Sequence, residues 1–142
     1  MWNEKLDAFC DRCRQAGLRI TPQRLAVYKV LVQTDTHPTA EDVFKGVRRE
    51  LPTISLDTVN RTLLTLAEIG AACIVEGTGQ PRRFDGGLEA HQHFRCLKCG
   101  KITDFHYAPY DAIELPPGFD DMRVLRKTVY LEGYCKGCKN NN

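Results

Sequence analysis

Two Cys-x-x-Cys pairs constrain this chain more than any other feature of its sequence. Cys96 and Cys99 form the first pair, and Cys135 and Cys138 form the second. Each pair can make a tight turn whose two sulfurs point at one cation, and four sulfurs are a typical shell for structural zinc. Because that shell leaves no open position, we expect a structural Zn²⁺ that holds the fold closed. A redox disulfide pair or unrelated cysteines are the alternatives.

The chain has seven cysteines. Whether they are reduced depends on the cellular compartment, and the N-terminal residues help to predict that compartment. The stretch "MWNEKLDAFCDRCRQ" carries acids and no apolar core of a signal peptide, and no apolar run approaches the roughly 18 residues of a membrane span. We therefore expect a cytoplasmic protein with no membrane partner, in which reduced thiols or bound metal are favoured over disulfides. Cys10 and Cys13 form a third pair, but they and Cys73 are expected to be small buried residues.

Apolar residues at helical spacing characterise the first seventy residues. Thr21 can cap one helix, Thr39 can cap a second that stops before Pro52, and Ser55 begins a third. Two short strands around a Gly-rich turn at 77–79 follow. Three helices and a hairpin in this order predict a winged helix-turn-helix, and a generic helical domain with a hairpin is the alternative. The apolar faces are expected to hold Leu25, Tyr28, Leu31, Val32, Val43, Phe44, Val47, Val59, Leu63 and Leu66.

The remainder of the chain is richer in predicted strands. We expect strands near 92–96, 101–106 and 122–134, and a short helix around 109–115 that is ended by Pro116-Pro117-Gly118. The fold class is therefore α+β: an N-terminal winged helix-turn-helix domain, then a small α/β dimerisation domain with a four-cysteine zinc site. The expected boundaries are 1–85 for the DNA-binding domain, 86–90 for a hinge, and 91–142 for the dimerisation and metal-binding domain.

Histidine and aspartate side chains near the first Cys pair predict a second metal site of different chemistry. His91 and His93 are two residues apart, so on a strand they project from the same face. If the Cys pair turns the chain into a hairpin with Cys96 opposite Lys101, then His93 lies opposite Asp104. We therefore interpret His91, His93 and Asp104 as ligands of one ion.

Two further candidate ligands come from the first domain. His37 lies in the loop between two predicted helices, next to Pro38, and Asp85 ends the predicted wing. Spacing alone leaves their participation open. Three imidazoles and two carboxylates together would suit manganese, ferrous iron or zinc, and neither calcium nor a thiophilic metal.

Six segments, read in order, resemble the ferric uptake regulator family, and its peroxide-sensing branch in particular. They are "GLRITPQR", "HPTAEDVF", "TVNRTLLTLAEIG", "RRFD", "HQHFRCLKCGKITDFH" and "YCKGC". The resemblance covers nearly the whole chain. It implies a metal-dependent, homodimeric transcriptional repressor that binds double-stranded operator DNA, and not an enzyme. By position it implies regulatory Fe²⁺ or Mn²⁺ on His37, Asp85, His91, His93 and Asp104, and structural Zn²⁺ on Cys96, Cys99, Cys135 and Cys138.

The same resemblance implies how such a protein would sense hydrogen peroxide. Five protein ligands leave a sixth position on ferrous iron open, and His37 and His91 are the positions that become 2-oxo-histidine. Oxidation would weaken iron binding and release DNA, whereas manganese should give a repressor that ignores peroxide. Asp104 favours this branch, because family members with glutamate there tend to respond to iron. The alternative is an iron- or zinc-responsive uptake repressor of the same family without an oxidation step.

The helix predicted to begin at Ser55 and end at Gly70 is the segment expected to read DNA. The net charge of +2 is too small to argue for nucleic acid, so this interpretation rests on the motif. Arg61 is a candidate for a phosphate or a guanine. Asn60 stands where the family usually has tyrosine, and asparagine prefers a bidentate pair with adenine. The expected DNA contacts are Arg19, Thr58, Asn60, Arg61 and Thr65.

Two interpretations from other functional classes compete with a repressor. A hydrolase could use His91, His93 and Asp104 to activate water, but no obvious general base accompanies them, and the helix-turn-helix would be unexplained. A zinc-binding adaptor predicts that DNA affinity does not depend on the second metal.

In the dimerisation region, Pro116-Pro117-Gly118 interrupts what is normally a longer helix in the family.

Overall fold

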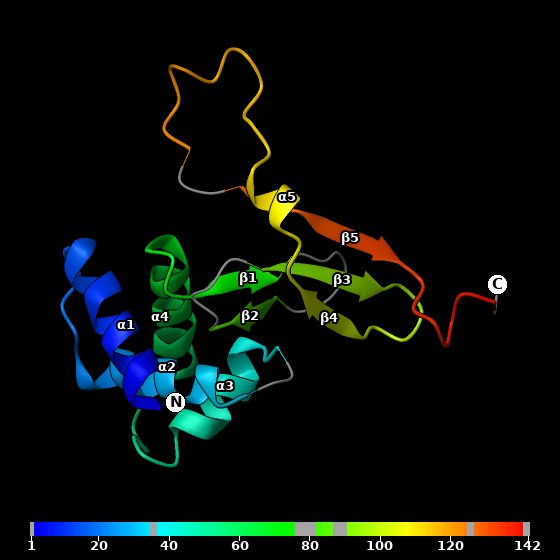
Figure 1. The fold of residues 1–142 in the computed structure, drawn as a ribbon. Coiled ribbons are helices and arrows are strands. Elements are labelled where there is room, and N and C mark those ends of the chain that lie inside the picture. Colours follow the sequence, from blue (N-terminus) through cyan, green and yellow to red (C-terminus); the bar gives the residue numbers. More distant parts are fainter. Residues whose placement is uncertain (1, 35–36, 76–81, 87–90, 125–126, 141–142) are drawn as a thin grey trace. The chain divides into compact units, whose positions relative to one another are not determined.

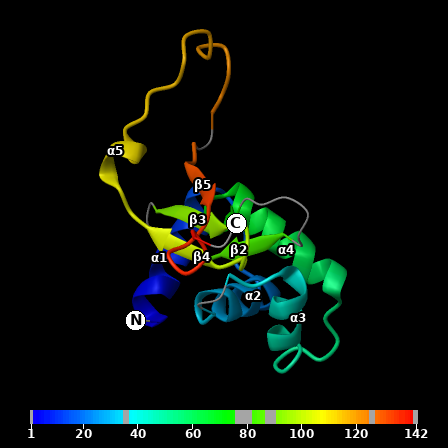
Figure 2. The same ribbon diagram turned by 90° about the vertical axis from the view of Figure 1, so that its right-hand side faces the viewer.

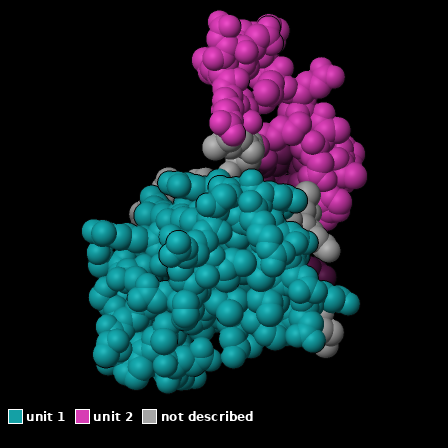
Figure 3. Space-filling model, turned by 90° about the vertical axis from the view of Figure 1, so that its left-hand side faces the viewer, with its two compact units in different colours: residues 1–88 teal, residues 89–142 magenta. Residues whose placement is uncertain are grey.

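The chain forms two compact units, residues 1–88 and 89–142, in a computed structural model (Figure 3). The structure describes residues 2–34, 37–75, 82–86, 91–124 and 127–140. The predicted turn at 77–79 lies outside the described residues, as does all of the predicted hinge except Gly86. None of the described helices is long and apolar enough to cross a membrane.

The described residues of the first unit form four helices and a two-stranded antiparallel sheet (Figure 1). Each predicted cap forms: the Thr21 side chain accepts from the N–H of Arg24, and the Ser55 side chain accepts from the N–H of Thr58. Thr39 and Asp42 make a reciprocal capping box. The elements are α1 (Trp2–Gln15), α2 (Pro22–Val32), α3 (Ala40–Val47), α4 (Leu56–Glu68), β1 (Cys73–Val75) and β2 (Arg83–Asp85).

Helix α3 ends at Val47, one turn before the predicted stop at Leu51. Beyond Val47 the chain continues in tighter turns, in which the N–H groups of Arg49 and Glu50 bond to carbonyls three residues back, at 3.4 and 3.0 Å. Such three-residue turns commonly close a helix. The prediction from Pro52 was therefore wrong about the end of the helix.

The core of the first unit confirms most of the predicted apolar faces. Val43, Val47, Val59, Leu63 and Leu66 are fully buried. In α2 the buried set is wider than predicted and includes Ala26 and Val27, whereas Leu25 and Val32 are only partly buried. Helix α1 packs against α2 through Tyr28, on which the Phe9 ring stacks with centroids 4.1 Å apart.

The second unit is a three-stranded sheet with the order β4-β3-β5 (Figures 1 and 2). Central β3 is antiparallel to β4 and parallel to β5. Cys96 is the one fully buried apolar residue that the described part of this unit contributes. The elements are β3 (Gln92–Cys96), β4 (Ile102–Phe105), α5 (Ala108–Asp111) and β5 (Tyr130–Gly133).

Two predicted elements of this unit are shorter in the structure. Helix α5 ends at Asp111, before the predicted 115, and the strand predicted over 122–134 begins only at Tyr130. The described residues 112–124 form no helix or strand, and all of them are exposed. Figure 1 shows this segment extending from α5 away from the sheet. The prolines at 116 and 117 disfavour helix there, and Gly118 has a φ of 97° that other residues rarely adopt.

Candidate functional site

The parallel pairing of β3 with β5 brings the two Cys pairs together. Cys96 lies opposite Gly133 in this register, and the N–H of Leu97 donates to the carbonyl of Gly133 at 2.7 Å. The first Cys pair begins at Cys96, the last residue of β3, and the second begins at Cys135, shortly after β5 ends at Gly133. Two strands that run side by side in the same direction therefore deliver both pairs to the same end of the sheet.

The four sulfurs have the geometry of a tetrahedral metal site. All four Sγ atoms lie within 4.8 Å of one another, and the Sγ atoms of Cys99 and Cys135 are 3.8 Å apart. A tetrahedron with zinc–sulfur bonds of about 2.3 Å has sulfurs about 3.8 Å apart. The four residues, Cys96, Cys99, Cys135 and Cys138, are the set predicted from the sequence.

Main-chain donors prepare one of these sulfurs for a cation. The N–H groups of Cys135 and Cys99 each donate to Sγ of Cys96 at 3.4 Å, and these bonds lower the pKa of Cys96 to about 6. The pKa of Cys138 is raised to about 12, chiefly by a side-chain hydrogen bond with Cys135. Four neighbouring thiolates repel one another without a cation, and a coordinated metal ion deprotonates such thiols outright. The donor set therefore fits zinc.

The first unit holds a histidine and a carboxylate side by side. His37 Nε2 lies 3.8 Å from Asp85 Oδ2, and both side chains are largely buried. His37 follows α2, whereas Asp85 ends β2. Two hydrogen bonds connect these segments. The main-chain N–H of Phe84 donates to the Pro38 carbonyl at 2.9 Å, and the side-chain Nη1 of Arg83 donates to the His37 carbonyl at 2.9 Å.

His37 has the single positive φ among the described non-glycine residues, at 54°. A residue before proline is ordinarily extended, and a left-handed conformation at a non-glycine position costs about 1–3 kcal/mol. The contacts of Arg83 and Phe84 hold this conformation in place. Such strain is frequent at functional sites. The sequence predicted a backbone fixed by Pro38, but not this conformation.

The second unit holds a pair of the same chemistry. His93 Nε2 lies 3.3 Å from Asp104 Oδ1, and the two residues are direct partners in the β3–β4 register, which confirms the predicted pairing. Cys96 also meets Lys101 as predicted, through an N–H···O=C bond of 2.9 Å. The rings of His91 and His93 meet edge to face with centroids 4.7 Å apart. Each unit thus presents imidazole nitrogen next to carboxylate oxygen, a donor set that suits ferrous iron, manganese or zinc.

The predicted DNA contacts lie at the start of the chain and along α4. Arg19 is exposed before α2, and its carbonyl accepts from Arg24 Nη1 at 2.7 Å. Arg61 is exposed on α4 and forms an ion pair with Asp57. Asn60, half-buried, lines an open hollow together with Asp57 and Arg82. Thr58 and Thr65 are also half-buried.

The sequence interpretation missed Gln92, which lies between His91 and His93 and begins β3. Its side chain is buried and spans to the next element: Nε2 donates to Asp111 Oδ1 at 2.8 Å, and Oε1 accepts from the Tyr107 N–H at 2.9 Å. His106 contacts the other oxygen of Asp111 at 2.5 Å and lowers the pKa of that carboxyl. These contacts fix α5 to the strand that carries His91 and His93. The sequence did contain a signal for Gln92. Strand alternation makes this position face inward, and a polar residue there could have been noticed.

Comparison with protein families places these sites in a known context. Residues 15–115 match the model of the ferric uptake regulator family.

The chain belongs to the ferric uptake regulator family.

Relatives of known role within the family include peroxide-responsive repressors. The chain is 37% identical over 138 residues to the peroxide-responsive repressor PerR of Staphylococcus epidermidis, an alignment that covers 96% of this chain and 92% of that protein. It is 36% identical over 128 residues to PerR of Staphylococcus aureus, covering 89% and 86%. These relatives are repressors, so the expectation of a regulator and not an enzyme is confirmed.

Solved structures of the ferric uptake regulator family share the fold. The peroxide stress regulator of Campylobacter jejuni aligns with a TM-score of 0.61 at 28% identity, over 94% of this chain and 98% of that one. The ferric uptake regulator Fur of Helicobacter pylori aligns with a TM-score of 0.67 at 23% identity, over 98% and 94%. The predicted α+β fold class is therefore confirmed.

Proposed function

We propose that this chain is a metal-dependent, homodimeric transcriptional repressor that releases operator DNA when hydrogen peroxide oxidises histidines at its regulatory metal. Relatives named as peroxide-responsive repressors, aligned over nearly the whole chain, support the sensing role. The observation that carries the metal dependence is that each unit presents a histidine–aspartate pair with donor atoms less than 4 Å apart. The four-cysteine cluster would hold structural zinc.

One divalent ion, Fe²⁺ or Mn²⁺, would be shared by the two pairs. Its proposed ligands are His37 and Asp85 from the first unit and His91, His93 and Asp104 from the second. An ion that takes ligands from both units fixes their relative angle. In a homodimer this would set the two α4 helices about one DNA turn, roughly 34 Å, apart, as a symmetric operator requires. Metal binding and DNA binding would then strengthen each other by the same factor.

The histidines would carry the response to peroxide. Iron bound there would supply the redox chemistry that activates hydrogen peroxide. At C2 of His37 or His91 the C–H bond would be replaced by C=O and the hydrogen would move to a ring nitrogen. The histidine ring would lose the two electrons that the peroxide gains, so that histidine and H₂O₂ give 2-oxo-histidine and water. The modified ring is a poorer ligand, and the link between the units would be lost. Because this regulation acts on chromosomal DNA, we propose that the protein works in the cytoplasm.

The decisive experiment is mass spectrometry of the iron-loaded protein after brief exposure to peroxide. We expect a gain of about 16 Da, the mass of one oxygen, on His37 or His91 and release of operator DNA, with no change in the manganese-loaded protein. His106 is an internal control, because its exposed ring contacts Asp111 and not a proposed ligand. Equal oxidation of His106 would mean that oxidation is not directed by the metal.

Two other outcomes would select different functions. Oxidation confined to cysteines, with loss of zinc, would replace this mechanism with a thiol switch. Iron-dependent operator binding that survives peroxide, with all histidines intact, would identify an uptake repressor of the same family.

A further inference from the structure

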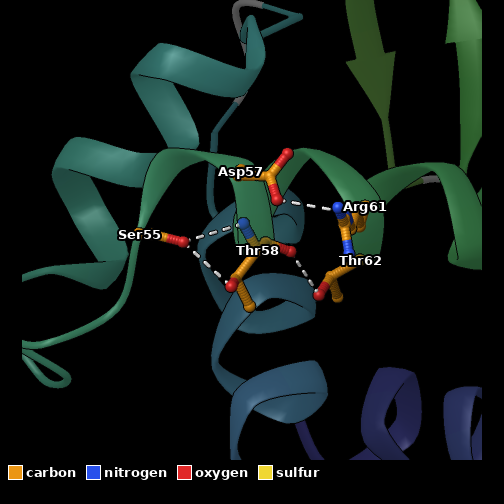
Figure 4. A network of polar contacts seen from close by, with 5 residues as sticks. All are labelled: Ser55, Asp57, Thr58, Arg61 and Thr62. Atoms are coloured by element: carbon orange, nitrogen blue, oxygen red, sulfur yellow. Dashed lines mark hydrogen bonds and ion pairs between the residues drawn. The ribbon is translucent and has the colours of Figure 1, made fainter.

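An ion pair on the exposed surface of α4 determines how Arg61 is presented. Arg61 Nε lies 3.1 Å from Asp57 Oδ2, one helical turn away, and the two side chains are 78% and 69% exposed (Figure 4). Nε is the Arg61 nitrogen that this ion pair places beside the carboxylate. Among the described residues its two terminal Nη groups have no partner, so the forked end of the guanidinium is available for a ligand.

The backbone beneath this pair is held by a separate set of hydrogen bonds. The Ser55 hydroxyl accepts from the Thr58 N–H at 3.1 Å and donates to the Thr58 hydroxyl at 2.9 Å. The Thr62 hydroxyl donates to the Thr58 carbonyl at 2.8 Å. Figure 4 shows these contacts in the same turns that carry Asp57 and Arg61. The helix start therefore does not depend on Asp57 for its cap.

Stability does not explain the pair, because exposed ion pairs of this spacing contribute little to a helix. Charge does not explain it as a phosphate contact either. Affinity for phosphates comes from net positive charge, and the Asp57 carboxylate cancels the charge of Arg61. The pair instead sets the direction of the Arg61 side chain. With Nε beside the Asp57 carboxylate, the end of the side chain presents two parallel N–H donors. Those donors match O6 and N7 of guanine in the major groove.

We propose that Asp57 is a positioning residue that directs Arg61 to read a guanine in the operator, and not to bind phosphate. This inference rests on the proposed function only in requiring that α4 reads operator DNA. Arg61 contacts the base, and Asp57 acts through Arg61. An acid in the first turn also interacts favourably with the helix dipole, and that role alone would leave base preference unaffected.

The test is selection of binding sites from randomised duplex DNA by the manganese-loaded full-length protein. It is followed by affinity measurements on the selected site and on versions with each guanine replaced. The variants are Asp57→Ala, which frees the guanidinium, and Arg61→Lys, which keeps the charge but removes the fork. The matched control is Asp11→Ala. It breaks the exposed Asp11–Arg14 pair of α1, which has an N···O distance of 3.3 Å, with the same change in net charge.

We expect the wild type to prefer guanine at one position of each half-site by about 5- to 150-fold, the range for one bidentate contact. Arg61→Lys should weaken this preference, because an ammonium lacks the planar fork, and Asp57→Ala should also weaken it. Asp57→Ala should also steepen the dependence of log K on log salt by about 0.9, because an uncompensated Arg61 can bind a phosphate. Asp11→Ala should change neither quantity by a comparable amount.

The outcomes separate this inference from the proposed function. If the wild type selects no common sequence, the proposed function fails. If the wild type selects an operator and Asp57→Ala reads it with the same guanine preference, the positioning role is wrong and the repressor stands. A guanine preference as strong in Arg61→Lys as in the wild type would overturn the assignment of Arg61. Circular dichroism melting would show that both variants are folded.

Discussion

Removing the metal from the four-cysteine cluster should unfold the second unit and leave the first unit folded. The perturbation is Cys135→Ser, which removes one of four sulfurs and the 3.8 Å contact with Cys99. The described part of the second unit contributes a single fully buried apolar residue, Cys96. Its strands therefore have little hydrophobic burial to hold them together. The first unit has its own core of helices α1 to α4.

The expected magnitude follows from the zinc contribution. Binding of structural zinc supplies about 10–16 kcal/mol in small domains, against a total stability of about 5–15 kcal/mol for a typical domain. Losing the ion should thus remove all of the net stability of the second unit. The parallel pairing of β3 with β5 should be lost, because the proposed ion would close the chain between Cys99 and Cys135 there.

Hydrogen exchange read by mass spectrometry is the measurement, with zinc content measured alongside. We expect amides of β3 and β5 to exchange at unfolded rates in Cys135→Ser, while those of α4 stay protected. Cys73→Ser is the matched control, because Cys73 belongs to β1 of the first unit, and it should keep both zinc and protection in β3. A zinc-free Cys135→Ser protein with β3 still protected would refute the reasoning.

Three further substitutions test packing and hydrogen bonding. Gly46→Ala should lower the melting temperature at a cost of about 1–3 kcal/mol, because the added Cβ would lie 2.8 Å from Cγ1 of Val30; an unchanged melting temperature would contradict this. Cys13→Ser, at a fully buried position, should destabilise the protein by about 1–3 kcal/mol in urea titrations without changing zinc content; loss of zinc would instead make Cys13 a ligand. Gln92→Leu leaves the Tyr107 N–H without its acceptor and should destabilise the second unit by about 1–3 kcal/mol. The amides of α5 should then exchange hydrogen faster. Unchanged hydrogen exchange would show that Gln92 does not fix that helix.

Local chemistry made the helix starts predictable. Thr21, Thr39 and Ser55 cap helices because a side-chain oxygen next to the first turn satisfies main-chain N–H groups within three residues. The His93–Asp104 pairing was predictable for the same reason, since a tight hairpin fixes register by counting residues from its turn. These features depend on separations of a few residues, which a sequence displays directly.

Contacts between distant segments were not predictable. The parallel β3–β5 pairing spans more than thirty residues, and nothing near Tyr130 specifies the partner of that strand. The stacking of Phe9 of α1 on Tyr28 of α2 joins residues far apart in the sequence, and the left-handed conformation of His37 follows from contacts with β2. Helix ends were less predictable than helix starts, because tighter turns can follow Val47 without a distinctive residue.

The sequence by itself determined which atoms can bind metal here: four sulfurs in two pairs, and imidazoles beside carboxylates. Only the tertiary structure decided that a parallel strand pair brings the two predicted Cys pairs together, and that Arg61 Nε lies beside the Asp57 carboxylate. The physical reason is that donor chemistry belongs to individual side chains. The direction in which a donor points depends on packing and on neighbouring charges that the linear order does not record.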